Sequence, residues 1–246
     1  MMNKNGMITS LLVAMFLVPV QGIAAQVPSY QQSLEKQQAE RAKQPSPFSE
    51  EDLAIMKRTG EELASRMPDP GIKIGEHAPD FTLPNAYGNK VSLFESLKEG
   101  PVVLVFYRGA WCPFCNMQLH ILQQSVPFFE QYGARLITIT PQTPDKSAEQ
   151  VKKDGLPFEV LSDLDSNVMK AYHLYFELDD ELVKVYRKHG LDIEAFNGAG
   201  RNVLPVPGTF VIDREGVVVA MQADLDYTKR MEPQAIIEAL QTLSDQ

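Results

Sequence analysis

Two cysteines within one helical turn are the residues of this chain whose spacing most directly indicates chemistry. Cys112 and Cys115 are the only cysteines among 246 residues, and they stand in the stretch FYRGAWCPFCN. On a helix this spacing places both sulfurs on one face, where they can join as a disulfide. Such a bond closes a very short loop and adds little stability through chain entropy. The pair is therefore predicted to be a redox-active dithiol.

The residues around the pair predict that it opens a helix. The run PVVLVFY (101–107) is typical of a strand buried on both faces, and a helix is expected from about Cys112 to Tyr132, with Gly133 as its stop. Pro113 suits the first helical position, which makes Cys112 the N-cap. The free N–H groups at a helix N-terminus stabilise a thiolate. This position predicts that Cys112 is the more exposed and more acidic cysteine.

Three other roles for the cysteines have less support. Structural zinc takes about four ligands, no second cysteine pair exists, and the four histidines are scattered, so no metal site is expected. An inert structural disulfide would contribute little entropy. Buried cysteines acting as small hydrophobic residues do not suit the shaped turn that Trp111 and Pro113 indicate.

Composition and charge limit the class of protein. Hydrophobic residues make up 44% and charged residues 22%, a balance typical of one globular domain with extensions. The formal net charge of −9 repels phosphate backbones, and no basic cluster reverses this locally, so nucleic acid is excluded as an expected partner.

The N-terminus is typical of a secretory signal peptide. Lys4 precedes an apolar run from Met7 to Val20, and small residues follow it, so cleavage is expected after Ala24 or Ala25. The alternative is an uncleaved membrane anchor, but the run is short for a bilayer span and Pro19 interrupts it. The sequence thus predicts a signal peptide over residues 1–25 and export to the periplasm or cell envelope.

Residues 26–71 are predicted to form a helical N-terminal extension. Residues 26–48 are rich in Gln, Lys and Glu, and they are expected to be a solvated or loosely docked arm, although a helix is an alternative. Ser49 and Asp52 resemble a capping box that opens a helix over residues 49–67, with one apolar stripe.

Strands that alternate with helices from residue 72 onward predict an α/β domain with a central sheet. Residues 173–206 are an insertion before the last hairpin. The expected elements are a hairpin around NAYGN, a strand at 134–140, a helix from Thr143 to Gly155, a short strand in FEVLSD, a helix near 166–172, a hairpin around REG, and a closing helix from Pro233.

Several of these stretches together resemble a known family. GEHAPDFTLPN, FYRGAWCPFCNMQL, ITPQTPD, LPVPGTFVIDREG and DYTKRMEP occur in the order found in the alkyl hydroperoxide reductase/thiol-specific antioxidant family, in its peroxiredoxin-like branch carrying C-x-x-C. The resemblance covers roughly residues 72–243. It implies a thioredoxin-like fold over residues 72–246, with a central mixed sheet, flanking helices and an N-terminal hairpin. It also implies a cis-proline at Pro207, facing the cysteine pair.

The chain departs from the family's usual motif, Pro-x-x-x-Thr/Ser-x-x-Cys. That register puts Cys115 in the peroxidatic position, Cys112 in place of the Thr/Ser, and Arg108 in place of the proline. Gly208 replaces the arginine that usually precedes the Thr-Phe strand. Arg108 could restore the lost positive charge, or it could be a surface residue paired with a carboxylate. The resemblance favours Cys115 as first nucleophile and the helix position favours Cys112, so the order stays open.

Two functions follow. The resemblance implies a cysteine-based peroxidase that reduces hydrogen peroxide or organic hydroperoxides without organic cofactor or metal, and that a thioredoxin-like or membrane thiol–disulfide donor recycles. The alternative is an exported thiol–disulfide oxidoreductase acting on protein thiols, which export and the W-C-P-x-C signature favour. A homodimer is a possibility.

The candidate site residues divide into two groups. Tyr227 and Arg230 are interpreted as packing and surface charge rather than chemistry. The candidates are Cys112 and Cys115 as the catalytic redox pair, and Arg108, Trp111, Pro113 and Pro207 as supporting residues.

Overall fold

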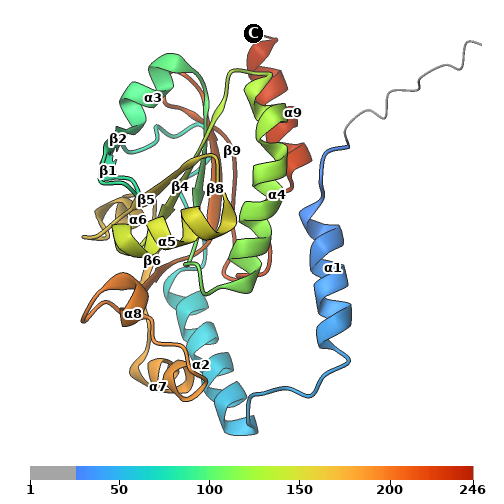
Figure 1. Cartoon of the computed structure of the whole chain (residues 1–246), viewed down its shortest axis with the longest axis vertical. Coiled ribbons are helices and arrows are strands. Elements are labelled where there is room, and N and C mark those ends of the chain that lie inside the picture. The colour runs from blue at the N-terminus through green and yellow to red at the C-terminus, as the bar shows by residue number, and fades with distance from the viewer. Residues whose placement is uncertain (1–25, 246) are drawn as a thin grey trace, which may run out of the picture.

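A five-stranded mixed sheet forms the centre of the protein (Figure 1). The computed structural model describes residues 26–245, so the predicted signal peptide lies outside the described residues. The strand order is β5-β4-β3-β8-β9, with β3, β4 and β5 parallel and with β8 antiparallel to both β3 and β9. The predicted α/β fold with a central mixed sheet is therefore confirmed. The strands are β3 (Val102–Phe106), β4 (Arg135–Thr140), β5 (Glu159–Ser162), β8 (Gly208–Ile212) and β9 (Val218–Ala223).

Four short strands lie outside this sheet. β1 (Thr82–Pro84) and β2 (Lys90–Ser92) form the predicted N-terminal hairpin around the NAYGN turn. β6 (Tyr175–Glu177) pairs with β7 (Val203–Pro205) within the insertion. The second predicted hairpin is also confirmed, since β8 and β9 pair across the turn that contains REG.

The predicted helices are present in the predicted order as α2, α4, α5, α6 and α9, whereas α3, α7 and α8 were not predicted. α4 begins directly after Cys112, α5 begins at Pro144 after Thr143, and the left-handed Gly155 closes α5, as predicted. The helices are α1 (Tyr30–Arg41), α2 (Glu50–Arg66), α3 (Leu93–Glu99), α4 (Pro113–Glu130), α5 (Pro144–Asp154), α6 (Asn167–Ala171), α7 (Asp180–Lys188), α8 (Glu194–Asn197) and α9 (Pro233–Ser244).

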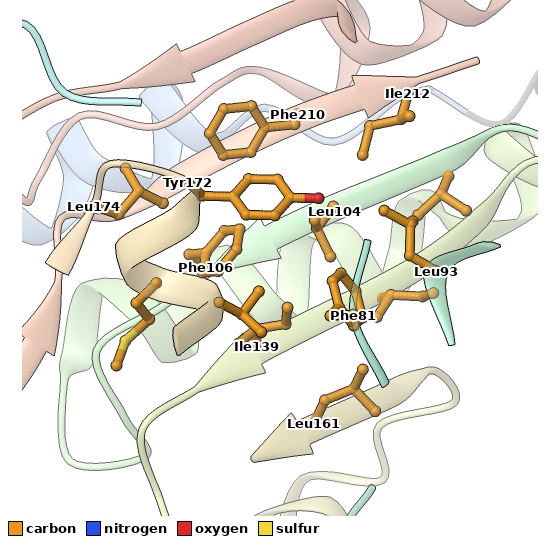
Figure 2. Packing of buried hydrophobic residues seen from close by; sticks show 14 of the residues in the cluster. Phe81, Leu93, Leu104, Phe106, Ile139, Leu161, Tyr172, Leu174, Phe210 and Ile212 are labelled. Carbon is orange, nitrogen blue, oxygen red and sulfur yellow. The ribbon is translucent and has the colours of Figure 1, made fainter. Parts of the chain in front are cut away.

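Alternating side chains of the central strand β3 bury both faces of the sheet. Val103 and Val105 pack with residues of α4 and α9, which lie side by side on one face (Figure 1). Leu104 and Phe106 point to the other face, where Tyr172 lies between Phe106 and Phe210 (Figure 2). Burial on both faces explains the continuous apolar run in this strand. This packing also fixes the position of the C-terminal end of β3, where the loop that leads to Cys112 begins.

The N-terminal extension differs in part from its prediction. The capping box is present, because Ser49 and Asp52 exchange side-chain and backbone hydrogen bonds at the start of α2. The preceding segment is not a loosely docked arm, because it contains α1, which packs against α4. Tyr30 and Leu34 of α1 are buried in the hydrophobic cluster that contains the two cysteines. These two apolar contacts, in a mostly polar helix, decide its position.

The expected cis-proline is absent from the described residues, so the prediction for Pro207 is wrong. Pro207 links β7 to β8, and the Val206 N–H donates to the Leu174 carbonyl at 2.7 Å. A trans X–Pro bond is favoured by about 0.5–1 kcal/mol, and the extended connection between the strands accommodates it. Within residues 26–245, no helix is both long and apolar enough to cross a membrane.

Candidate active site

The motif loop runs from the end of β3 to the start of α4. Cys112 is the N-cap residue with an extended backbone, and Pro113 occupies the first helical position, as the sequence predicts. Gly109 has φ +151, and a Cβ there would lie 2.5 Å from Nε1 of Trp111. Only glycine therefore allows the indole to fold back over the loop.

A buried chain of polar side chains holds this loop in place. The Ala110 N–H donates to Gln142 at 2.8 Å, and the Asn116 amide donates to the Ala110 carbonyl at 2.7 Å. Gln150 connects these groups, since it donates to Asn116 and accepts from the Tyr107 hydroxyl at 2.8 Å. Because the partners come from α4, from α5 and from the segments that follow β3 and β4, the fold as a whole fixes the loop.

The two sulfurs are reduced and buried, with exposed fractions of 1% for Cys112 and 0% for Cys115. Burial raises the pKa of Cys115, but the Cys112 thiol, the Arg230 charge and the Arg108 backbone N–H stabilise its thiolate and bring the pKa below the ordinary value. The hydrogen bond to Cys115, together with burial, raises the pKa of Cys112. Cys112 is the cysteine that lines the cleft, in line with the expected exposure, but these contacts favour the thiolate on Cys115 rather than on Cys112.

Arg230 supplies positive charge to Cys115. Its Nη2 lies 3.7 Å from the Cys115 sulfur, and the residue is 7% exposed. Its Nε donates to Gln118 at 2.8 Å, and its Nη1 donates to the Lys229 carbonyl at 2.8 Å. The interpretation of Arg230 as surface charge is wrong, because its side chain is buried next to the Cys115 sulfur.

Arg108 is the second buried cation, with an exposed fraction of 5%. Its guanidinium lies over the rings of Trp111 and Tyr227, at 4.9 and 4.6 Å, and Nη2 donates to the Tyr186 hydroxyl at 2.9 Å. It has no carboxylate partner among residues 26–245, so the alternative of a surface ion pair is wrong. Its Nε is buried and has no hydrogen-bond partner among those residues.

A cleft of about 850 Å³ opens onto the motif loop. It is lined by Arg108, Cys112 and Tyr227, and by residues of α1, α2 and the segment between these helices. A neighbouring cavity of about 450 Å³ shares Arg108 and Tyr227 and contains Pro207 in its wall. Pro207 and Arg108 therefore line the same cavity.

Comparison with known proteins identifies the family. The AhpC/TSA family matches residues 74–221, which is more than half of the chain. The chain belongs to the AhpC/TSA family. Peroxiredoxin Bcp of Bacillus subtilis is 28% identical over 71% of this chain and 96% of its own length. Thiol-disulfide oxidoreductase ResA of Geobacillus kaustophilus is 24% identical over 60% of this chain and 67% of its own length.

A solved structure agrees with this family in its fold. Peroxidoxin BcpB from Mycobacterium tuberculosis superposes with a TM-score of 0.56 and 22% identity, over 70% of this chain and 98% of that one. The likeness establishes a thioredoxin-like peroxiredoxin fold. The resemblance stated from the motifs is thereby confirmed for both family and fold.

Within this AhpC/TSA site, the structure brings together most of the predicted residues. Arg108, Trp111, Cys112, Pro113 and Cys115 lie on one continuous stretch and share one environment. Among residues 26–245, no group of three or more His, Cys, Asp and Glu residues could hold a metal ion.

Sequence reasoning missed three residues that contribute to the environment of Cys115. Gln118 follows Cys115 by three positions on the same face of α4, a spacing that could have indicated its role. Arg230 lies in the family stretch DYTKRMEP, which was its only signal. Tyr30 lies in a polar segment that gave no signal.

Proposed function

We propose that this protein is a thiol peroxidase in which Cys115 attacks a hydroperoxide and Cys112 resolves the product. The observation that carries the proposal is the convergence of the Arg230 guanidinium and the Cys112 thiol on the Cys115 sulfur. A buried thiolate with these two partners is ionised at neutral pH, which is the form that attacks peroxides. The names of the peroxiredoxin relatives support this reading.

The first step forms one S–O bond and breaks the O–O bond. The Cys115 thiolate attacks the terminal oxygen of the hydroperoxide, which stays on the sulfur as the sulfenic acid oxygen. The other oxygen leaves as hydroxide or alkoxide and takes up a proton to give water or an alcohol. Arg108 lines the cleft, so its guanidinium is placed to stabilise the developing charge on a peroxide oxygen, and its charge compensates for the arginine that Gly208 replaces.

The second step forms the disulfide. The Cys112 thiol attacks the sulfenic acid sulfur, and water leaves with the sulfenic oxygen. An external dithiol then supplies two electrons and two protons to restore both thiols. A thioredoxin-like protein or a membrane thiol–disulfide protein is the proposed donor. The cycle as proposed uses only these two cysteines and needs neither a metal nor an organic cofactor.

The decisive experiment mixes reduced protein with hydrogen peroxide or an organic hydroperoxide. Trp111 is the only tryptophan, and it lies over Arg108 next to Cys112, so its fluorescence should change when the disulfide forms. A rapid, peroxide-dependent change in wild type supports the proposal. A reaction no faster than that of a free thiol of the same pKa would refute it.

A thiol–disulfide oxidoreductase is the second candidate, and the likeness to ResA is the observation that favours it. Such an enzyme would attack protein disulfides through Cys112, the sulfur that faces the cleft. The Cys115→Ser variant should then trap mixed disulfides with protein partners. The raised pKa of Cys112 opposes this role, because a protonated thiol is a poor nucleophile.

We also propose that the mature protein is exported and begins near Ala25 or Gln26. The apolar run from Met7 to Val20 and the small residues after it support this proposal. Mass spectrometry of protein from the cell envelope should find the shortened N-terminus. Recovery of a chain with an intact N-terminal segment from a soluble cytosolic fraction would refute export.

A further inference from the structure

The segment Thr228–Glu232 carries Arg230 at its centre and belongs to no helix or strand. It lies between β9 and α9. Residues in such a connection are held by individual contacts rather than by a regular ladder of backbone hydrogen bonds. The placement of Arg230 beside Cys115 therefore depends on whatever fixes this segment.

A single residue of the N-terminal extension contacts both ends of the segment. The Tyr30 hydroxyl donates to the Thr228 carbonyl at 2.7 Å, and the Tyr30 backbone N–H donates to the Glu232 carboxylate at 3.0 Å. The neighbouring Gln31 N–H donates to the same carboxylate at 2.6 Å. Glu232 thus satisfies free N–H groups in the first turn of α1, where a negative charge is favourable.

Tyr30 is buried, so its ring has one fixed position from which the hydroxyl reaches the Thr228 carbonyl. Tyr30 is only 1% exposed, and it belongs to the hydrophobic cluster that contains Cys112 and Cys115. Burial also raises the pKa of Tyr30 to about 12, so its hydroxyl keeps the proton that it donates. The aromatic ring, the hydroxyl and the backbone N–H therefore all contribute to one arrangement.

We propose that Tyr30 is a positioning residue that holds the Thr228–Glu232 segment so that Arg230 faces the Cys115 sulfur. The inference deepens the proposed peroxidase function, because it assigns to the N-terminal extension the task of keeping Cys115 ionised. Gln118 fixes the guanidinium of Arg230, and Tyr30 fixes the backbone from which that side chain extends. Without Tyr30 the cation should move away from the sulfur.

The groups that affect the ionisation of Cys115 come from four parts of the fold. Burial raises the pKa of the Tyr107 phenol above its ordinary value, and its hydroxyl is hydrogen-bonded to Gln150. Both nearby phenols are therefore neutral where thiols titrate. The groups are Cys112 on α4, Arg108 and Tyr107 after β3, Arg230 before α9, and Tyr30 on α1.

The test is the Tyr30→Phe variant of the reduced, full chain, with thiolate ultraviolet absorbance measured against pH. The change removes only the hydroxyl, so the first thiolate midpoint should rise by about half a unit or more. Tyr175→Phe is the matched control, because it removes a tyrosine hydroxyl that donates to Glu177 on β6. The control should leave the midpoint unchanged.

A double-mutant cycle separates positioning from general destabilisation. In an Arg230→Gln background, Tyr30→Phe should cause no further shift, because the cation on which it acts is gone. An equal shift in both backgrounds, or no shift in wild type, would overturn the proposal. If Tyr30→Phe fails to give a native circular dichroism spectrum, Glu232→Gln replaces it, with the same shift expected and the same outcomes decisive.

The readout also separates this inference from the proposed function. Thiolate absorbance is measured without peroxide, so a shift in Tyr30→Phe supports the positioning role even if the protein proves to be a disulfide exchanger. Fast peroxide reduction by a Tyr30→Phe variant with an unchanged thiolate midpoint would instead reject the positioning role and leave the peroxidase intact.

Discussion

Two buried arginines lie near the cysteine pair, and their surroundings differ. Arg230 is held by hydrogen bonds to Gln118 and to the Lys229 carbonyl, and it points at the Cys115 sulfur. Arg108 is held mainly by the faces of two aromatic rings, it lines the cleft, and its Nε has no hydrogen-bond partner among residues 26–245. Hydrogen bonds fix a guanidinium in one orientation, whereas ring faces leave its donors available.

Under the proposed function, this difference predicts separate roles for the two arginines. We expect Arg230, which is hydrogen-bonded and lies next to the Cys115 sulfur, to affect the ionisation of Cys115. We expect Arg108, which lines the cleft, to affect the reacting oxygen. Variants of each arginine should therefore change different measured quantities.

The largest effect is expected from replacing the cysteines, which tests whether Cys115 is the sulfur whose reaction the two arginines promote. Cys115→Ser should lose all peroxide reaction above buffer background, because no thiolate remains in the charged site. Cys112→Ser should keep a first-step rate constant within about tenfold of wild type and accumulate sulfenic acid, since a serine hydroxyl can still donate to the thiolate. Stopped-flow peroxide consumption checks both. If Cys112→Ser loses the reaction and Cys115→Ser keeps it, Cys112 is the first nucleophile and the proposed order is refuted.

The next largest effect is expected for Arg230, whose guanidinium donates hydrogen bonds to Gln118 and to the Lys229 carbonyl. Arg230→Gln removes an opposite charge close to the thiolate, so the thiolate midpoint should rise by about one unit. The rate constant below that midpoint should fall by about tenfold and recover at higher pH. Arg230→Lys is the control that keeps the charge. A pH-independent loss would assign Arg230 to the substrate instead.

A smaller effect is expected for Arg108, the cation that lines the cleft. Arg108→Lys keeps the charge but loses the planar set of donors, so the rate constant should fall by about three- to tenfold even where Cys115 is fully ionised. The thiolate midpoint should move little. Peroxide consumption across pH is the measurement. If the loss disappears at high pH, the two arginines share one role and the prediction of separate roles is wrong.

The smallest effect is on stability. The pKa of Cys115 is lower in the folded protein than the value of about 8.5 expected for an unfolded chain. Its stabilising contribution is therefore fully present above that value and is lost as pH falls through the folded pKa. Urea unfolding of reduced wild type should show a stability that rises through neutral pH relative to Cys115→Ser, by about 1.4 kcal/mol for each unit of pKa lowering. If the difference in unfolding free energy between wild type and Cys115→Ser stays constant with pH, the folded protein does not lower the pKa of Cys115.

Local patterns in the sequence determined much of the fold. The β-branched run of β3, the proline that opens α4, the capping box of α2 and the turn residues of both hairpins each act through neighbouring residues, so they could be predicted from the chain alone. The family motifs then correctly indicated the thioredoxin-like fold. The candidate cysteines and Arg108 were predicted because they share one stretch with a distinct pattern.

Only the tertiary structure decided which charged groups lie next to each sulfur. The helix N-terminus, a local feature, favoured Cys112, but Arg230 lies 115 positions along the chain from Cys115 and reaches it through the fold. Tyr30 joins the same site from the opposite end of the chain, across 202 positions to Glu232. Thiol acidity depends on distances to charges and on burial, and these are set by contacts between segments that no local spacing in the sequence records.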